Sequence, residues 1–180
     1  MMIVMGLPGA GKSTVLAIAK EAGWTVLNYG DMMMEIAKSK GIADRDQLRK
    51  QPAEFQKDIQ RQVGEKLTKE KRRNVILDTH CSISTSGGYL PGLPFAFLQK
   101  WQVERLVLLT APIKDILARR KNDTSRVRDE ESGDSLAEHD MMNRSYLASY
   151  SALTGAPAMI LVNANGKLEE VQASFRKLLA

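Results

Sequence analysis

Glycines, a lysine and a serine near the start of the chain stand at the spacing of a phosphate-binding loop. The stretch reads G-x-x-x-x-G-K-S and runs Gly6-Leu7-Pro8-Gly9-Ala10-Gly11-Lys12-Ser13-Thr14. The glycines let such a loop turn its backbone N–H groups onto an anion, and the N-terminus of a following helix adds partial positive charge. Lys12 can reach the β- and γ-phosphates of a nucleotide, and the Ser13 hydroxyl can bind Mg²⁺.

The residues on either side of this loop supply the elements that the motif needs. An apolar run of strand length, residues 1–5, leads straight into the loop. Residues 14–22 then carry apolar side chains at helical spacing. Strand, loop and helix therefore follow in order, which favours a nucleotide-phosphate site over a chance glycine-rich turn.

A second candidate site residue is Asp78, which follows the apolar run Val75-Ile76-Leu77. A carboxylate at the C-terminal end of a buried strand is where phosphate-loop proteins organise Mg²⁺. We expect Asp78 on the same sheet edge as Lys12. Thr79 and His80 come next and could contact a phosphate acceptor, although His80 could equally be a supporting hydrogen-bond partner.

Two arginines form a third candidate group. Arg45 and Arg49 are four residues apart in a short predicted helix, so they share one face. The two guanidinium groups need either an anion between them or neighbouring carboxylates, which Asp44 and Asp46 could provide. We favour a phosphate between them.

More arginines surround a polar stretch at residues 122–134. A predicted helix over residues 113–120 ends in Arg119 and Arg120, and the polar stretch contains Arg126 and Arg128. An arginine-bearing segment between two helices at the ligand edge suggests a lid, which would close over phosphates and exclude water. The alternative is a solvated loop whose arginines pair with the acidic residues at 129–131.

The elements that position these groups alternate along the chain. Five apolar segments read as strands and are separated by helical segments: residues 1–5, 24–27, 75–77, 106–109 and 158–162. This order predicts an α/β fold, a three-layer sandwich around a five-stranded parallel sheet with helices on both faces.

Several local features complete the prediction. Asp31 looks like the N-cap of a helix over residues 32–40, and residues 135–138 look like a capping box that opens a long helix to about residue 153.

Met32-Met33-Met34 is read as core filler more than as a ligand surface. Residues 82–94 are read as an ordered covering loop, and the turn at 163–166 could border a nucleobase.

Composition restricts the class of protein. With 180 residues, 43% hydrophobic and 26% charged, the chain is expected to form one domain, and no apolar run approaches the roughly 20 residues of a membrane span. Because the phosphate loop begins at residue 6, we expect no removable leader. The single cysteine, Cys81, excludes an internal disulfide and a four-cysteine zinc site, and favours the cytoplasm.

The net charge of +5 fits arginines around a polyphosphate better than a nucleic-acid surface.

Together these residues favour phosphoryl transfer. The predicted ligand edge has an excess of cations and one carboxylate for a metal, and phosphoryl transfer needs positioning and charge neutralisation above all. A phosphate acceptor is already anionic near neutral pH, so it needs no general base, and none is evident. Arginines in two segments outside the phosphate loop fit a phosphorylated acceptor better than an alcohol.

The sequence resembles the P-loop nucleoside monophosphate kinases, and within them the archaeal type of adenylate kinase. General features are residues 6–14 and the Gly30-Asp31 turn, while the more specific blocks are 44–50, 78–80, 88–94 and Met142-Asn143-Arg144. The resemblance covers nearly the whole chain and implies the reaction ATP + AMP ⇌ 2 ADP with Mg²⁺. It also implies a helical AMP-binding insertion near residues 30–70, a short lid near 120–135, a cytoplasmic location and a homotrimer.

The same resemblance assigns residues to roles. It implies ATP binding by residues 6–14, with Mg²⁺ at Ser13 and Asp78, partly through water. Residues facing AMP would be Gly30, Asp31, Arg45, Arg49, Asp78, Thr79 and His80. Residues acting on the transferring phosphate would be Lys12, Arg120, Arg126, Arg128 and Arg144. The sequence departs from the family in a short link around residues 23–24, which bears on the trimer contacts.

Two other functions remain open at this point. One is a kinase for another nucleoside monophosphate or for a small molecule such as an alcohol. The other is an RNA-binding assembly factor that uses the phosphate loop as a switch, supported only by the basic balance and by the run Lys69-Glu70-Lys71-Arg72-Arg73.

Overall fold

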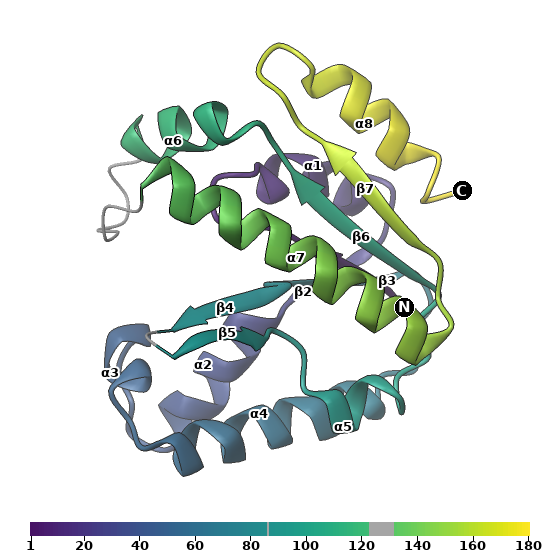
Figure 1. The fold of residues 1–180 in the computed structure, drawn as a ribbon. Coiled ribbons are helices and arrows are strands. Elements are labelled where there is room, and N and C mark those ends of the chain that lie inside the picture. The colour runs from purple at the N-terminus through teal and green to yellow at the C-terminus, as the bar shows by residue number, and fades with distance from the viewer. Residues whose placement is uncertain (86, 123–131) are drawn as a thin grey trace.

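The computed structural model describes residues 1–85, 87–122 and 132–180, and within them not the side chains of Asp46, Arg49 and Ala53. A five-stranded parallel sheet runs through its centre in the order β2-β3-β1-β6-β7 (Figure 1). The strands are β1 (Met2–Met5), β2 (Thr25–Asn28), β3 (Val75–Thr79), β6 (Arg105–Thr110) and β7 (Ala158–Val162). All five lie at or within a residue or two of the predicted segments.

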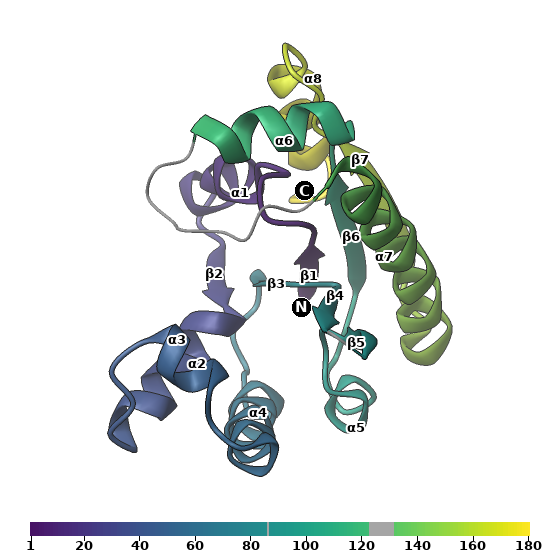
Figure 2. The same cartoon turned by 60° about the vertical axis from the view of Figure 1, so that its left-hand side comes forward.

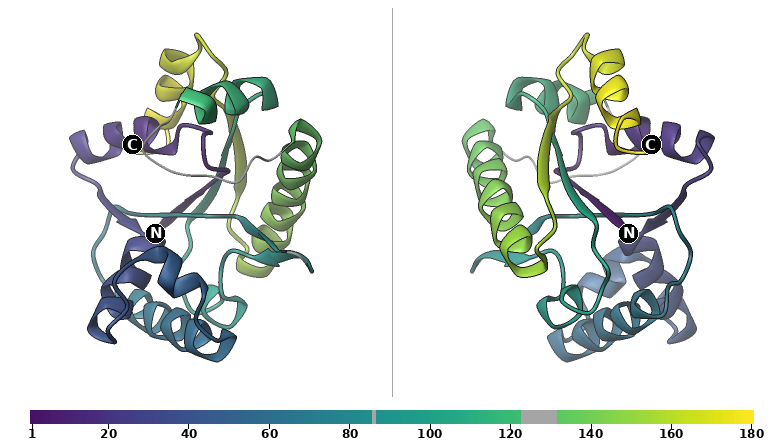
Figure 3. Two further views of the ribbon diagram at one scale, coloured as in Figure 1. Left: turned by 90° about the vertical axis from the view of Figure 1, so that its left-hand side faces the viewer. Right: turned by 90° about the vertical axis from the view of Figure 1, so that its right-hand side faces the viewer.

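The central strands are apolar without interruption because helices cover both of their faces. In β1, Met2 and Val4 pack with α1 (Lys12–Glu21) and α8 (Leu168–Arg176), whereas Ile3 and Met5 pack on the other side with α7 (Gly133–Thr154). Figure 3 shows α7 across the sheet from α1 and α8. The predicted three-layer α/β sandwich is confirmed.

A group of three helices lies between β2 and β3 in the sequence. They are α2 (Tyr29–Ser39), α3 (Arg45–Arg49) and α4 (Ala53–Thr68), here called the helical arm. Met34, Ala37, Leu48 and Ile59 form its own small core. Figure 2 shows the arm as a distinct group, away from α8 and from α6 (Ile113–Asn122).

Two helix starts differ from the sequence prediction in the same way. The N-cap of α2 is Asn28, whose Oδ1 accepts a hydrogen bond from the Asp31 backbone N–H at 3.0 Å. The N-cap of α7 is Ser132, whose Oγ accepts from the Ser135 N–H at 3.1 Å. Asp31 and Ser135 were the predicted N-cap residues, but each lies three positions after the true cap and supplies the N–H that the cap binds.

The segment over residues 82–94 is not a simple loop. It contains an antiparallel hairpin of β4 (Ser82–Thr85) and β5 (Gly88–Pro91), and the short helix α5 (Phe95–Leu98) follows. Gly92 lies so close to the chain before the hairpin that an added Cβ would be 2.2 Å from the His80 carbonyl oxygen. Across residues 1–85, 87–122 and 132–180, no helix has the length and apolar character of a membrane span.

Candidate active site

A pocket of about 560 Å³ opens at the C-terminal ends of β1, β2 and β3. Parallel strands place their C-terminal ends at one edge of the sheet, so loops far apart in the sequence meet there. The lining comes from the loop after β1, the β2–α2 turn, the end of β3, α3, α4, the hairpin and α6.

The loop after β1 takes the conformation that its glycines allow. Gly11 has a left-handed φ of 90°, and an added Cβ would lie 2.3 Å from Asn163 Nδ2. An added Cβ on Gly6 would lie 2.2 Å from the Leu109 carbonyl oxygen of β6. Lys12 donates to the Gly6 carbonyl at 2.9 Å and so folds back over the loop. Close backbone packing therefore explains why these positions carry glycine.

Asp78 lies across the pocket edge from this lysine. Its Oδ1 is 3.8 Å from Lys12 Nζ, and its Oδ2 accepts a hydrogen bond from Asn28 Nδ2 at 2.8 Å. Burial raises the pKa of the Asp78 carboxyl, and nearby Lys12 opposes that rise. Lys12 and Asp78 were expected on one edge of the sheet, and the structure brings them together.

The Asp78 carboxylate retains an unfilled acceptor. Its Oδ1 is buried and makes no hydrogen bond within the described residues. Ser13 lines the same pocket. No group of three or more histidine, cysteine or acidic side chains with metal-binding geometry occurs in the part of the chain that the structure describes. The residues therefore fit a hard cation that takes one carboxylate, one hydroxyl and oxygens from water and phosphate, as Mg²⁺ does.

Asn28 is a site residue that the sequence prediction did not include. Its backbone pairs in register with Asp78, so the two side chains emerge side by side from adjacent strands. Its Nδ2 holds Asp78, while its Oδ1 caps α2. One feature of the sequence could have pointed to Asn28: it is a small polar residue at the C-terminal end of an apolar strand.

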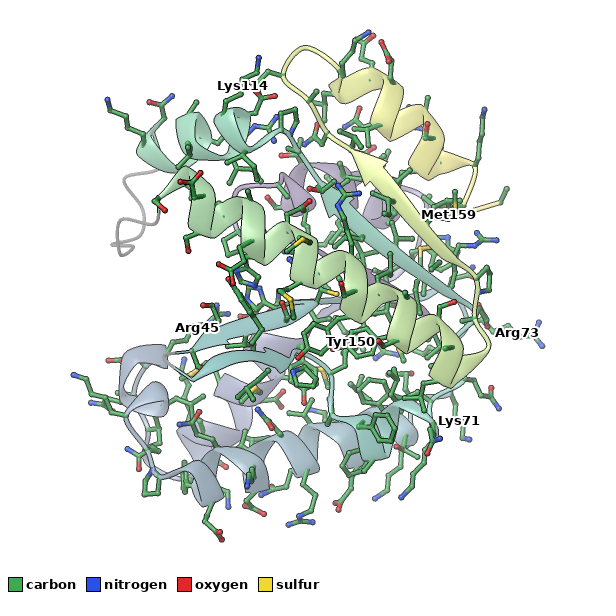
Figure 4. All side chains as sticks on the ribbon, viewed as in Figure 1. Arg45, Lys71, Arg73, Lys114, Tyr150 and Met159 are labelled. Atoms are coloured by element: carbon green, nitrogen blue, oxygen red, sulfur yellow. The ribbon has the colours of Figure 1, made fainter. Side chains whose placement is uncertain are left out.

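Predicted acceptor-side residues also gather at the pocket. Gly30, Asp31, Arg45, Thr79 and His80 all belong to its lining. Arg45 projects from α3 (Figure 4), and its Nη2 donates to Asp31 Oδ1 at 2.6 Å. This pair is exposed, with 44% and 74% of the two side chains accessible, so water screens it strongly.

Arg45 pairs with a carboxylate other than the two that lie beside it in the sequence. The Asp44 side chain accepts from the Gln47 N–H at 2.8 Å and acts as a cap, while Arg45 reaches Asp31 instead. The side chains of Asp46 and Arg49 lie outside the described part of the structure.

The arginines of α6 hold the phosphate loop from the other side. Arg120 Nε donates to the Pro8 carbonyl at 2.9 Å. Arg119, which lines the pocket, donates through Nη1 to the Gly9 and Ala10 carbonyls at 3.3 and 3.4 Å. Both guanidinium groups therefore add positive charge beside the loop and brace its backbone.

The turn after β7 lies against the same loop. Asn163 Nδ2 donates to the Ala10 carbonyl at 2.9 Å, and Arg119 donates to the Asn163 carbonyl at 2.8 Å and to Asn165 Oδ1 at 2.7 Å. The turn predicted at 163–166 is thus next to the phosphate loop. That it borders a nucleobase stays a prediction.

Of the remaining predicted arginines, the structure describes only Arg144. Arg144 lies on α7, where its Nε donates to Asp140 Oδ2 at 2.9 Å, and it does not belong to the pocket lining. Arg126 and Arg128 lie outside the described residues.

The chain is similar in sequence to one family model and to several adenylate kinases. A family model described as "AAA domain" matches residues 5–137. The chain is 41% identical over 181 residues to an adenylate kinase of Methanothermobacter thermautotrophicus, covering 99% of this chain and 98% of the relative. It is 45% identical over 170 residues to an adenylate kinase of Thermoplasma volcanium, with 93% of each chain covered.

Solved structures agree on the fold. A shikimate kinase from Bacteroides thetaiotaomicron superposes with a TM-score of 0.62 at 14% identity, covering 99% of this chain and 97% of that one. A shikimate kinase from Acinetobacter baumannii in complex with shikimate gives 0.60 at 19% identity, covering 99% and 91%. At these identities the likeness shows a shared fold and not a shared substrate.

Proposed function

This chain belongs to the adenylate kinase family, and we propose that its pocket carries out ATP + AMP ⇌ 2 ADP, with ATP on residues 6–14 and AMP between the helical arm and the end of β3. One observation carries the proposal. Lys12 from the phosphate loop and Arg45 from α3 line one pocket, so two phosphate-bearing ligands can meet there.

The donor half rests on the loop and its supports. The backbone of residues 6–14 and the Lys12 ammonium would hold the ATP phosphates. Arg119 and Arg120 fix the carbonyls of Pro8, Gly9 and Ala10, which keeps the loop N–H groups turned toward the ligand. This arrangement stabilises negative charge before the reaction begins, so little reorganisation is needed during transfer.

Mg²⁺ is part of the proposal, with Ser13 and the free acceptor of Asp78 as the residues that would hold it. The ion would neutralise charge on the donor phosphates. Asn28 orients the Asp78 carboxylate through its other oxygen. Burial of Asp78 weakens the competition from water for its Oδ1.

The acceptor half needs cations and no general base. Gly30, Asp31, Arg45, Thr79 and His80 supply its lining, and Asp78 serves both halves. An AMP phosphate is ionised near neutral pH, so its oxygen can attack without losing a proton. Arg45 would exchange its exposed contact with Asp31 for the phosphate, at small cost because water already screens that contact. Arg49 is proposed to join it.

The other assignments complete the proposal. Residues 1–180 would form one kinase domain with the AMP-binding insertion at about 30–70 and a short lid at about 120–135. Arg120, Arg126, Arg128 and Arg144 would serve the lid and the transferring phosphate, and Arg144 would first have to leave Asp140. A cytoplasmic location and no stable nucleic-acid partner belong to the same proposal.

A homotrimer is also proposed, and the exposed edge of the sheet supports an oligomer. Among the strands that the structure describes, β7 pairs only with β6, and its uncharged side chains Met159, Ile160 and Val162 are 38%, 41% and 53% exposed. An apolar edge strand without charged residues favours burial against another chain. Light scattering of the purified protein gives its molar mass in solution and so tests whether it is a trimer.

The test of the function is a coupled assay of ADP release with AMP, GMP, CMP, UMP and shikimate as acceptors. We expect AMP to give the highest kcat/KM by at least roughly tenfold, because a site that hydrogen-bonds its substrate rejects analogues strongly. A better acceptor among the others would replace AMP. ATP hydrolysis with tight, salt-sensitive RNA binding and no transfer would favour the assembly-factor alternative.

A further inference from the structure

Gln60 is a half-buried amide on α4 that lines the pocket. Its helix packs against α2, so Gln60 enters the pocket from the helical arm and not from the phosphate loop. The same lining includes Tyr29 and Met33, one turn apart on α2, and Ile83 of β4. The Tyr29 hydroxyl donates to the Gln60 backbone carbonyl at 3.5 Å, which ties α2 and α4 together here.

The side-chain amide of Gln60 differs from the other amides of the helical arm. Gln47 Oε1 accepts from the Ala43 N–H, and Gln51 Nε2 donates to the Gln47 carbonyl. Gln56 and Gln62 donate to the Gln51 carbonyl and to Asp58 Oδ2, at 2.9 and 2.7 Å. Within the described residues these four amides are bonded.

The Gln60 side chain makes no hydrogen bond to any described residue, although it is less accessible to water than an exposed glutamine. A half-buried amide without a partner loses hydrogen bonds to water and gains none from the protein. Such a group is well placed to bond to a ligand.

Two apolar side chains in the same lining fit a flat ring. Met33 is half-buried and Ile83 is 41% exposed, and both face the open pocket, so apolar surface is available there. Phosphates cannot use such a surface, and the cations of the pocket lie on other elements. This part of the pocket therefore matches the base of a nucleotide and not its phosphate.

We propose that Gln60 reads the base of the acceptor nucleotide, an inference that rests on AMP being the acceptor. The amide presents one donor and one acceptor side by side. Adenine presents the complementary pair, with the 6-amino N–H donating to Oε1 and a ring nitrogen accepting from Nε2. Gln60 is thus a specificity-determining residue for 6-aminopurine acceptors, and Met33 and Ile83 pack against the ring.

The first test removes the amide and keeps its size. The protein is compared with Gln60→Met using AMP and purine riboside monophosphate, which lacks the 6-amino group. In the unchanged protein AMP should be the better acceptor by about tenfold or more in kcat/KM, because an unpaired polar group is left when the amino group is absent. In Gln60→Met the two acceptors should become equal within about twofold. An unchanged preference in the variant would overturn the inference.

A second variant asks for a gain of specificity. Gln60→Glu offers two acceptors and no donor, which suits the N1–H and 2-amino N–H of guanine and leaves the ring nitrogen of adenine unpaired. The ratio of kcat/KM for GMP to that for AMP should rise by about tenfold or more. A ratio that stays the same would count against Gln60.

The controls separate this inference from the proposed function. Gln62→Met alters the neighbouring glutamine, which bonds Asp58 and does not line the pocket, so its acceptor preference should equal that of the unchanged protein. The KM for ATP and the urea midpoint should stay constant in both Gln60 variants if they fold normally. If the unchanged protein does not use AMP, the proposed function is wrong. If the unchanged protein uses AMP and Gln60→Met still prefers AMP to purine riboside monophosphate, only the role of Gln60 is wrong.

Discussion

Asn143 accepts a hydrogen bond from the Ser82 hydroxyl at 2.7 Å, and both residues are almost completely buried. The Asn143 carbonyl also accepts from the Cys81 thiol at 3.2 Å, and His139 one turn earlier contacts the Ser82 carbonyl at 3.3 Å. Helix α7 is therefore attached by buried polar contacts to the chain that directly follows His80. The second and third turns of α7 thus set the position of the hairpin beside the pocket.

Replacing Asn143 should reveal this attachment. We expect Asn143→Ala to lower the free energy of unfolding by about 2 kcal/mol, because it leaves the buried Ser82 hydroxyl without its acceptor. Urea denaturation measures the change. Ser145→Ala, on the exposed side of the same helix, should change it by less than about 0.5 kcal/mol. Equal effects of the two substitutions would contradict a special role for Asn143.

Lys12→Met should abolish transfer while the fold is kept. The lysine is the cation nearest to both Gly6 and Asp78, and its loss should lower kcat by at least roughly 10²-fold, as loss of one preorganised donor does. The assay is ADP formation from ATP and AMP. Lys20→Met removes an exposed lysine from the same helix and should leave kcat unchanged. Turnover that survives in Lys12→Met would remove the loop from the active site.

Arg45→Ala should weaken the use of AMP and spare ATP. We expect the KM for AMP to rise by about tenfold or more, because a charge-assisted hydrogen bond to phosphate contributes about 1.5–3 kcal/mol. The matched control is Arg61→Ala, which removes an exposed arginine of the helical arm that pairs with Asp58 and Glu65. Steady-state kinetics with AMP and ATP varied in turn give the two KM values. The same measurement on Arg49→Ala tests the second arginine. An equal rise in the KM for ATP would contradict an acceptor-side role.

Asp78→Asn should lower transfer activity and raise the free energy of unfolding. Burial raises the pKa of Asp78 above its ordinary 3.8, so the ionised carboxylate opposes folding, and its unfavourable effect grows as pH rises through the folded-state pKa. At pH 7 the variant should be more stable by up to about 1 kcal/mol and should lose most transfer activity. Below pH 3.8 the wild-type carboxyl is protonated and the stability difference should vanish. A variant that is less stable at pH 7 would show that Lys12 outweighs burial.

Glu70→Gln should have the opposite dependence on pH. Hydrogen bonds from Arg72 lower the pKa of Glu70 from 4.5 to about 2, so the carboxylate stabilises the folded state above pH 4.5 and its contribution is lost as pH falls toward 2. Because Arg72 is exposed, we expect a loss of only about 0.5–1 kcal/mol at pH 7. Urea midpoints at pH 7, 4.5 and 3 should show that difference shrinking with acidity, and a constant difference would rule out this ion pair as the cause.

Local patterns were enough to predict the parts of the fold that neighbouring residues determine. The strand, glycine-rich loop and helix around Lys12 are specified within one short stretch, and so is Asp78 at the end of β3. The hairpin of β4 and β5 was missed because its stability comes from α7 and not from alternating apolar residues. Both wrong N-caps arose because Asp31 and Ser135 resemble caps by type, whereas the side chain that accepts the bond stands three residues earlier.

The site was harder to predict where it depends on distant contacts. Asn28 joins Asp78 only because β2 and β3 pair in register. Arg45 was expected to need a phosphate or a carboxylate beside it in the sequence, yet it reaches Asp31. Of Met32, Met33 and Met34, the first and last are core residues as predicted, whereas Met33 lies at the pocket. The side on which each residue lies becomes known only once α2 is placed against its neighbours.

The bond from Asn163 to the Ala10 carbonyl spans 153 positions of the chain and has a consequence for biosynthesis. The ribosome makes the phosphate loop well before it makes the asparagine that contacts it. A growing chain therefore carries a loop that lacks this one support until β7 has joined the sheet. We consequently expect a nascent chain to bind ATP more tightly once β7 has docked.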